Sequence, residues 1–142
     1  MTAGYSGTPL ARKLGIKEGH RVGTFGAPSG FRALVQLPPG ASWVRSPRTP
    51  VSVSVIFATD ETRLEARFGA AAAVLPANGG LWVAWPKKSS VLMTSLTFDI
   101  VQEHGLDAGL VDNKVCAIDD DWSGLRFVVR KEDRASWDVA AL

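Results

Sequence analysis

The chain has 142 residues, a length typical of one domain of about 100–200 residues. Hydrophobic residues make up 46% and charged residues 21%, which argues against a disordered chain. The net charge of +2, from 16 basic and 14 acidic residues, is too balanced to predict a nucleic-acid-binding face.

The sequence also carries no sign of export or membrane insertion. Residues 1–6 lack the basic start and the apolar core of a signal peptide. The longest apolar run, residues 69–75, is too short to span a bilayer. The single cysteine, Cys116, excludes an intramolecular disulfide and suits a reducing compartment. We therefore expect a soluble, cytoplasmic protein that binds neither nucleic acid nor membrane, and the sequence leaves homodimer formation open.

The first part of the chain predicts a helix, a strand and a glycine-rich turn. Thr8 and Pro9 are typical of a helix start, and Gly15 can close that helix. Residues 21–25 predict a strand, which leads into the turn at residues 26–30 and a second short helix. Strand, glycine turn and helix can together direct backbone N–H groups toward an anion. Gly26, Ser29 and Gly30 are therefore candidate ligand-binding residues.

Two strands and a longer helix are expected next. Residues 43–44 predict a short strand, and residues 51–57, rich in β-branched side chains, predict a stronger one. Asp60 follows as a natural helix cap, and residues 62–65 have the spacing of a capping box. Apolar residues then recur at helical spacing over residues 64–75, which predicts an amphipathic helix.

Residues 81–85 are expected to form the centre of the sheet. They follow a turn at residues 76–80 and contain five apolar residues without polar alternation, which is typical of a strand covered on both faces. Pro86 cannot donate a ladder hydrogen bond and is expected to end the strand. Lys87 and Lys88 would then stand at the edge of the sheet.

The last part of the chain predicts a helix and a hairpin. Leu92, Leu96 and Ile100 are spaced as one helix face, with Gly105 as its C-cap. Residues 108–118 and 125–130 predict two strands joined by a turn at 119–124. We assign residues 1–131 to a single α/β domain and residues 132–142 to a C-terminal tail.

This order of elements predicts a parallel sheet with right-handed crossovers, and it resembles the class I methyltransferase fold. Residues 22–30 occupy the place of that fold's first strand and glycine loop. The stretch Leu75-Pro76-x-x-Gly79-Gly80 resembles its leucine-proline-glycine-glycine turn. The resemblance implies a three-layer, Rossmann-like α/β fold, methyltransferase-like, with a mostly parallel sheet and a C-terminal antiparallel hairpin. It also implies S-adenosylmethionine as cofactor, yet Arg45 follows the second strand where an acidic residue would hold the ribose.

A closer resemblance is to a family of small actinobacterial proteins that carry a domain of unknown function. The longest stretches that support it are Gly80-Leu81-Trp82-Val83-Ala84-Trp85-Pro86-Lys87 and Trp122-Ser123-Gly124-Leu125-Arg126-Phe127-Val128. Shorter ones are Ala3-Gly4-Tyr5-Ser6, Leu14-Gly15-Ile16-Lys17 and Val115-Cys116-Ala117-Ile118-Asp119. This family implies a fold but no activity.

Ligands of an open parallel sheet bind beyond the carboxyl ends of its strands. That edge would collect the glycine turn, Asp60, the two lysines and the 119–124 turn, because the hairpin is expected beside the central strand. Lys87 and Lys88 could bind an anion, supply a desolvated nucleophile, or be solvated lysines that balance residues 119–121. Trp122 is either an exposed recognition platform or a buried residue that holds the hairpin.

No standard catalytic or metal-binding motif is present. The adjacent carboxylates at 119–121 lack EF-hand spacing, and Cys116 inside a strand is expected to be an inert thiol. We therefore expect a non-catalytic protein that binds a partner protein or a small anionic ligand at the carboxyl edge of a degenerate methyltransferase-like sheet. The alternative is an S-adenosylmethionine-dependent methyltransferase with an atypical glycine loop. The candidate ligand-binding residues are Gly26, Ser29, Gly30, Asp60, Lys87, Lys88, Asp120 and Trp122.

Overall fold

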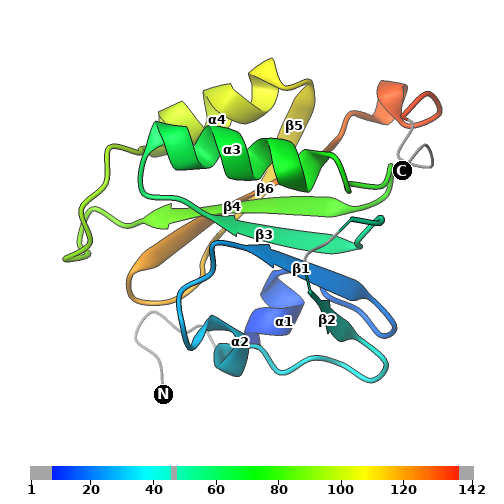
Figure 1. Ribbon diagram of the computed structural model, residues 1–142, viewed down its shortest axis with the longest axis horizontal. Coiled ribbons are helices and arrows are strands. Elements are labelled where there is room, and N and C mark those ends of the chain that lie inside the picture. Colours follow the sequence, from blue (N-terminus) through cyan, green and yellow to red (C-terminus); the bar gives the residue numbers. More distant parts are fainter. Residues whose placement is uncertain (1–7, 46–47, 138–142) are drawn as a thin grey trace.

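The computed structural model describes residues 8–45 and 48–137, whose strands form one six-stranded sheet in the order β2-β1-β3-β4-β6-β5. Four strands run parallel: β1 (Arg21–Phe25), β2 (Ser42–Val44), β3 (Val53–Phe57) and β4 (Gly80–Pro86). The last two, β5 (Leu110–Ala117) and β6 (Trp122–Val129), form an antiparallel hairpin beside β4 (Figure 1). The mostly parallel α/β sheet with a C-terminal hairpin is therefore confirmed.

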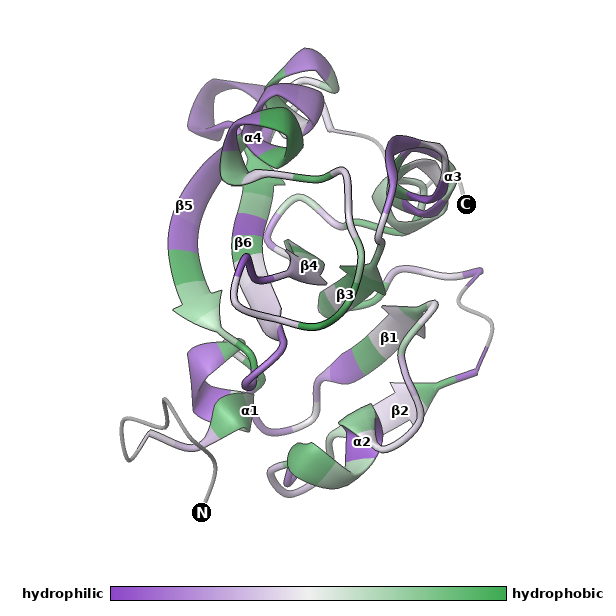
Figure 2. Cartoon of the chain, turned by 90° about the vertical axis from the view of Figure 1, so that its left-hand side faces the viewer, coloured by the Kyte–Doolittle hydropathy of each residue, from purple (hydrophilic) through white to green (hydrophobic). Residues whose placement is uncertain are grey.

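Helices cover both faces of the sheet, which gives three layers (Figure 2). The short helices α1 (Leu10–Lys13) and α2 (Phe31–Leu34) lie on one face. The longer helices α3 (Glu61–Ala72) and α4 (Phe98–Asp107) lie on the other. One apolar cluster fills the space on each side, and a short 3-10 helix, η1 (Lys131–Asp133), follows β6.

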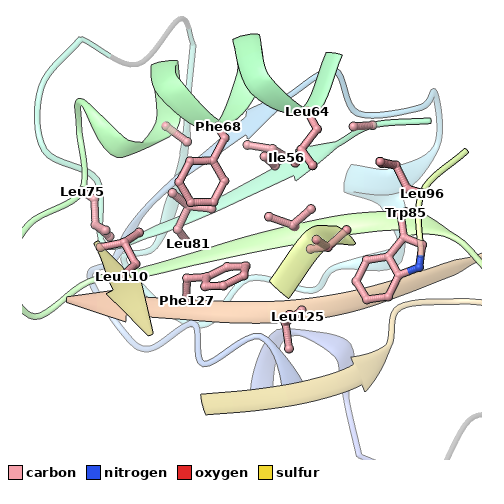
Figure 3. Packing of buried hydrophobic residues seen from close by; sticks show 14 of the residues in the cluster. Ile56, Leu64, Phe68, Leu75, Leu81, Trp85, Leu96, Leu110, Leu125 and Phe127 are labelled. Atoms are coloured by element: carbon pink, nitrogen blue, oxygen red, sulfur yellow. The ribbon is translucent and has the colours of Figure 1, made fainter. Parts of the chain in front are cut away.

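All seven residues of β4 are buried, as the unbroken apolar run predicts. Side chains of a strand alternate between the two faces of the sheet. Trp82 and Ala84 therefore enter the cluster beneath α1, whereas Leu81, Val83 and Trp85 enter the cluster beneath α3 and α4. Figure 3 shows the second of these clusters, in which Leu81 and Trp85 lie near Phe127 and Leu125 of β6.

The hairpin lies where the expected topology puts it. Pro86 pairs with Trp122, and the backbone N–H of Lys87 donates to the carbonyl oxygen of Asp121 at 2.8 Å. Residues separated by more than thirty positions are thereby brought together at the carboxyl end of β4. The inference that the lysines lie near the 119–121 turn is confirmed for Lys87.

The helix predicted from Leu92 onward begins later than its apolar spacing indicates. α4 starts at Phe98, and its N-cap is Thr97, whose hydroxyl accepts a hydrogen bond from the N–H of Ile100 at 3.3 Å. Residues 87–97 form an ordered loop instead. Gly105, predicted as the C-cap, lies inside α4, where it makes room for Phe127. The left-handed residue after the helix is Gly109, with φ of +89°.

Of two predicted helix caps, one differs from the structure and one, Asp60, is confirmed. The N-cap of α1 is Pro9 rather than Thr8. The N-cap of α3 is Asp60, whose carboxylate accepts a hydrogen bond from the backbone N–H of Arg63 at 2.8 Å. The helix therefore begins before the capping box predicted at residues 62–65. The Arg63 guanidinium forms an ion pair with the same carboxylate.

We expect Asp60→Ala to lower the stability of the protein at neutral pH and to have less effect in acid. The backbone N–H of Arg63, helped by its guanidinium, lowers the pKa of Asp60 below the ordinary value of 3.8. A carboxyl whose pKa is depressed in the folded state stabilises the fold above its unfolded pKa, and the contribution is lost as pH falls through the folded pKa. Urea unfolding at pH 7 and below pH 3 measures the difference. Thr62→Ala is the control, and an equal loss from that variant would contradict the assigned cap.

The described part of the C-terminal tail is attached to the body of the domain. Trp137 is half-buried, packs against the cluster beneath α3 and α4, and donates its indole N–H to the carbonyl oxygen of Leu75 at 2.7 Å. Residues 138–142 of the predicted tail lie outside the described residues. Within the described ranges, no helix has the length and apolar character needed to cross a membrane.

Candidate functional site

The strand order reverses between β1 and β3, since the chain leaves β1 toward β2 and then returns to the other side of β1. Ligands of α/β sheets bind at such a switch point, outside the carboxyl ends of the strands. The glycine turn at residues 26–30 lies there. It borders a depression of about 500 Å³, together with Thr24, Arg32 and Ala33.

The side chain of Arg67 lies between the carboxyl ends of β1 and β3. The Arg67 side chain reaches from α3, donates a hydrogen bond to the carbonyl oxygen of Phe57 at 2.5 Å, and lies against Gly26. A Cβ atom on Gly26 would stand 2.3 Å from the guanidinium carbon, and this glycine has φ of +72°. The glycine at position 26 therefore makes room for Arg67, a protein side chain.

The glycine turn also lacks the long helix that would make it an anion cradle. Its helix, α2, has four residues. Gly30 before it is left-handed, with φ of +89°, and the N–H of Phe31 bonds within the turn to the carbonyl oxygen of Pro28 at 3.2 Å. Pro28 has no N–H and that of Phe31 is already bonded, so neither residue offers a backbone donor to a ligand.

The residues of this crevice do not fit an adenosyl cofactor. β2 ends at Val44 and is followed by Arg45 rather than by a carboxylate that could accept the ribose hydroxyls. Asp60 is used as the α3 cap and is paired with Arg63. The described residues that line the depression include no acidic side chain.

A second hollow lies at the carboxyl end of β4, between the hairpin and the segment that leads into α4. We call it the β4 groove, and its volume is about 650 Å³. Half of its lining residues are apolar, five carry hydroxyl groups, and two are lysines. It is lined by Trp85, Pro86, Lys87, Lys88, Ser90, Leu92, Met93, Thr94, Ser95, Leu96, Thr97, Phe98, Val115 and Ser123.

The charge of the β4 groove is entirely positive. None of its lining residues is acidic, and in the described ranges neither Lys87 nor Lys88 forms an ion pair. The carboxylates of the nearby turn are used in other contacts, since Asp119 accepts hydrogen bonds from backbone N–H groups of the turn and Asp121 accepts one from Ser90. Among the described residues, both lysines are thus without an ion-pair partner.

The wall of the groove formed by residues 87–97 is held in place at both ends. The Ser90 hydroxyl donates to the Asp121 carboxylate at 3.0 Å, and the Thr94 hydroxyl donates to the carbonyl oxygen of Thr59 at 2.8 Å. Between these anchors, Val91 is 93% exposed and Met93 is 89% exposed. Large apolar side chains exposed on one short segment mark a binding surface where they form a contiguous patch.

The remaining candidate residues line neither hollow. Asp60 caps α3, and Asp120 is exposed at the tip of the hairpin turn. Trp122 is only 9% exposed and packs edge-on against Phe57, with ring centroids 5.1 Å apart. Of the two alternatives for Trp122, the buried residue that holds the hairpin therefore describes the structure.

Sequence reasoning missed the apolar wall of the groove. The sequence pattern places Leu92 on a helix face. It places Val115 in a strand but does not say which face of the sheet its side chain joins. Val115 is 58% exposed, and Phe98 lies 6.3 Å from Trp85 between ring centroids. The signal in the sequence was the apolar run at residues 91–93, close to the two lysines. The helical spacing of Leu92 and Leu96 instead predicted a helix there.

Two titratable groups outside both hollows, Cys116 and His20, have shifted pKa values. Burial raises the pKa of the Cys116 thiol, although Lys13 and Lys114 act in the opposite direction, so the thiol stays protonated at neutral pH. Burial, followed by the charge of Lys17, lowers the pKa of His20. Among the described residues, no group of three or more His, Cys, Asp or Glu side chains could hold a metal ion.

Comparison with known proteins identifies the fold. No protein-family model matches the chain, and no curated protein matches it. Solved structures do. A TehB-like SAM-dependent methyltransferase from Corynebacterium glutamicum has a TM-score of 0.57 and 13% identity, over 90% of this chain and 91% of that one. A precorrin-6y C5,15-methyltransferase from Geobacter metallireducens has a TM-score of 0.54 and 10% identity, over 85% and 86%.

A third structure, a DhpI–SAH complex, has a TM-score of 0.51 and 8% identity, over 78% of this chain and 77% of that one. Identities this low establish the fold alone. The chain has a methyltransferase-like α/β fold, as its order of elements predicts. The resemblance to the small actinobacterial family stays a prediction.

Proposed function

We propose that the protein binds a small amphipathic anion in the β4 groove, as a binding protein rather than as an enzyme. The observation that carries this proposal is the composition of the groove: half of its lining residues are apolar, two are lysines and none is acidic. The acid group of the ligand would lie at Lys87 and Lys88. Its apolar body would lie against Leu92, Phe98 and Val115.

The dimensions and chemistry of the groove suit such a ligand. Small-molecule sites commonly enclose about 300–1,000 Å³ and combine apolar walls with a few polar groups. Lysine ammonium groups bind anions as point charges on flexible stems, so they tolerate carboxylate or phosphate geometry. The flanking hydroxyls of Ser95, Thr97 and Ser123 add uncharged hydrogen-bonding groups.

An isothermal titration with octanoate tests this proposal. The wild type is expected to bind octanoate, and the double variant Lys87→Gln/Lys88→Gln is expected to bind it at least about tenfold more weakly, a loss of about 1.4 kcal/mol. Octanol, which has the chain without the charge, should also bind more weakly. Val115→Ser should weaken binding through the apolar wall.

Lys131→Gln, an exposed position on η1 away from the groove, is the matched control. Each of the groove variants changes an exposed or half-exposed side chain, so their stability should stay within about 0.5 kcal/mol of the wild type. If octanoate binds the double glutamine variant as tightly as the control variant, the ligand does not use the lysines and the proposal fails.

The second candidate is an S-adenosylmethionine-dependent methyltransferase with an atypical glycine loop. It is favoured by the names of the structural neighbours. It is opposed by Arg67 against Gly26 and by the absence of an acidic side chain among the described residues of the crevice. A rise in unfolding temperature with S-adenosylhomocysteine would favour it, since a ligand at about 100 times its Kd stabilises by about 2.7 kcal/mol.

A partner protein is the third candidate occupant of the groove. The exposure of Val91 and Met93 favours it, because both side chains project from an ordered segment beside the lysines. An acidic, apolar segment of a partner would use the same chemistry as the small anion. Val91 does not line the groove, so retention of octanoate binding after Val91→Ser, together with loss of a captured partner, would separate these two occupants.

A further inference from the structure

A half-buried arginine lies on the opposite face of the hairpin from the β4 groove. Arg126, in the middle of β6, pairs directly with Trp82 of β4, so its side chain lies on the face that α1 covers. The guanidinium lies against Gly80, where a Cβ atom would stand 2.6 Å from Nε. The glycine leaves room for the arginine along β4.

The Arg126 side chain lacks an anionic partner among the described residues. Its Nε is buried without a hydrogen-bond acceptor, and its Nη1 donates only to the amide oxygen of Asn113, at 3.4 Å. Burial lowers the pKa of Arg126, and no acidic group counteracts that effect. A positive charge that is partly removed from water and left unpaired destabilises the folded state.

A second cation is placed directly opposite the first. Lys114 of β5 pairs with Arg126 across the hairpin, so both side chains lie on the same face. The register shifts between Asp112 and Lys114, which leaves Asn113 as the extra residue of a bulge. Bulges redirect side chains and occur often beside functional sites. Like charges directly opposite in a hairpin are destabilising, so a bound anion would relieve the repulsion between them.

The surroundings of this pair are also basic. Cys116 lies two residues beyond Lys114, on the same face, opposite Gly124. Lys13 of α1 acts on the Cys116 thiol together with Lys114, so a third cation lies nearby. Figure 2 shows hydrophilic residues along much of β5 and a hydrophilic band across β6.

We propose that Arg126 and Lys114 form a phosphate-binding site on this face of the hairpin, for a phosphate group carried by a ligand. The guanidinium offers planar donors that match phosphate oxygens, and the lysine adds a second positive charge for a dianion. The site is separate from the β4 groove. Val115 and Ser123, which line the groove, lie on the opposite face of the hairpin from Lys114 and Arg126. It stands whether or not the groove binds an amphipathic anion.

Thermal unfolding in inorganic phosphate tests the site, with chloride at equal ionic strength as reference and acetate as the monoanion. The wild type is expected to unfold at a higher temperature in phosphate than in chloride, with a smaller rise in acetate. Arg126→Met removes the unpaired charge and keeps much of the length of the side chain. It is expected to be more stable than the wild type in chloride and to lose the phosphate-dependent rise.

Lys114→Met is expected to weaken phosphate binding at least tenfold, measured from the concentration dependence of the rise. Lys131→Met, on η1, should behave as the wild type. The proposal is overturned if phosphate does not stabilise the wild type beyond chloride, or if Arg126→Met keeps the full rise. Should Arg126→Met fail to fold, the Lys114→Met variant and ³¹P line broadening of phosphate by the wild type decide the question.

Discussion

Replacing Gly105 with alanine is expected to destabilise the protein by about 2–3 kcal/mol, as overpacking of a rigid core does. A Cβ atom at this position would stand 2.0 Å from Cε1 of Phe127. Phe127 is fully buried and packs edge-on against Phe68, with ring centroids 5.7 Å apart, so it has no free space into which to move. The clash therefore outweighs the gain in helix propensity of about 1 kcal/mol that alanine normally brings.

Gly69→Ala is the matched control, because it is also a glycine inside a helix. Gly69 lies on the exposed side of α3, and a Cβ atom there would meet nothing within 4 Å. This variant is expected to be more stable than the wild type by about 0.5–1 kcal/mol. Urea unfolding of both variants measures the contrast in sign. Equal stability of the two would mean that α4 does not pack on β6 as described.

Trp82→Ala is expected to destabilise the protein by about 3–5 kcal/mol, the usual range for removing a large aromatic side chain from a core. Trp82 is fully buried at the centre of β4. Its indole N–H donates to the carbonyl oxygen of Leu14 at 2.9 Å, so it connects the sheet to the segment after α1. The variant loses apolar burial and also leaves the Leu14 carbonyl without its donor.

Trp82→Phe separates these two contributions, since phenylalanine keeps much of the packing and loses the donor. Its loss should be about 1–3 kcal/mol, the penalty of an unsatisfied buried polar group. Denaturant unfolding with an unchanged m-value is the measurement. A loss below 1 kcal/mol for Trp82→Ala would be incompatible with a fully buried tryptophan.

The sheet could be predicted from the sequence because its strands have strong local signals. An unbroken apolar run identifies β4, and β-branched residues identify β3. The start of α4 could not be predicted in this way, since Leu92 and Leu96 have helical spacing. In the structure Leu96 is buried while the hydroxyl of Thr94 bonds to the backbone after β3, a tertiary contact that overrides the local pattern.

The candidate site was predictable only in part. Lys87 and Lys88 follow from the strand that precedes them, and the position of the hairpin beside them follows from the topology. The apolar wall depends on which face of the sheet carries the side chain of Val115 in β5. The register of the hairpin determines that face, and sequence spacing does not. The contact at Gly26 depends on a long side chain, Arg67, that reaches over from α3.

The most direct test of the ligand site is a backbone amide map by NMR, recorded with octanoate and separately with S-adenosylhomocysteine. Octanoate is expected to shift the amides of residues 87–98, together with Val115 and Ser123, and S-adenosylhomocysteine is expected to leave residues 24–30 unchanged. If S-adenosylhomocysteine instead shifts residues 24–30 while octanoate shifts none of the groove residues, the site lies in the glycine crevice and the binding function assigned to the β4 groove is wrong.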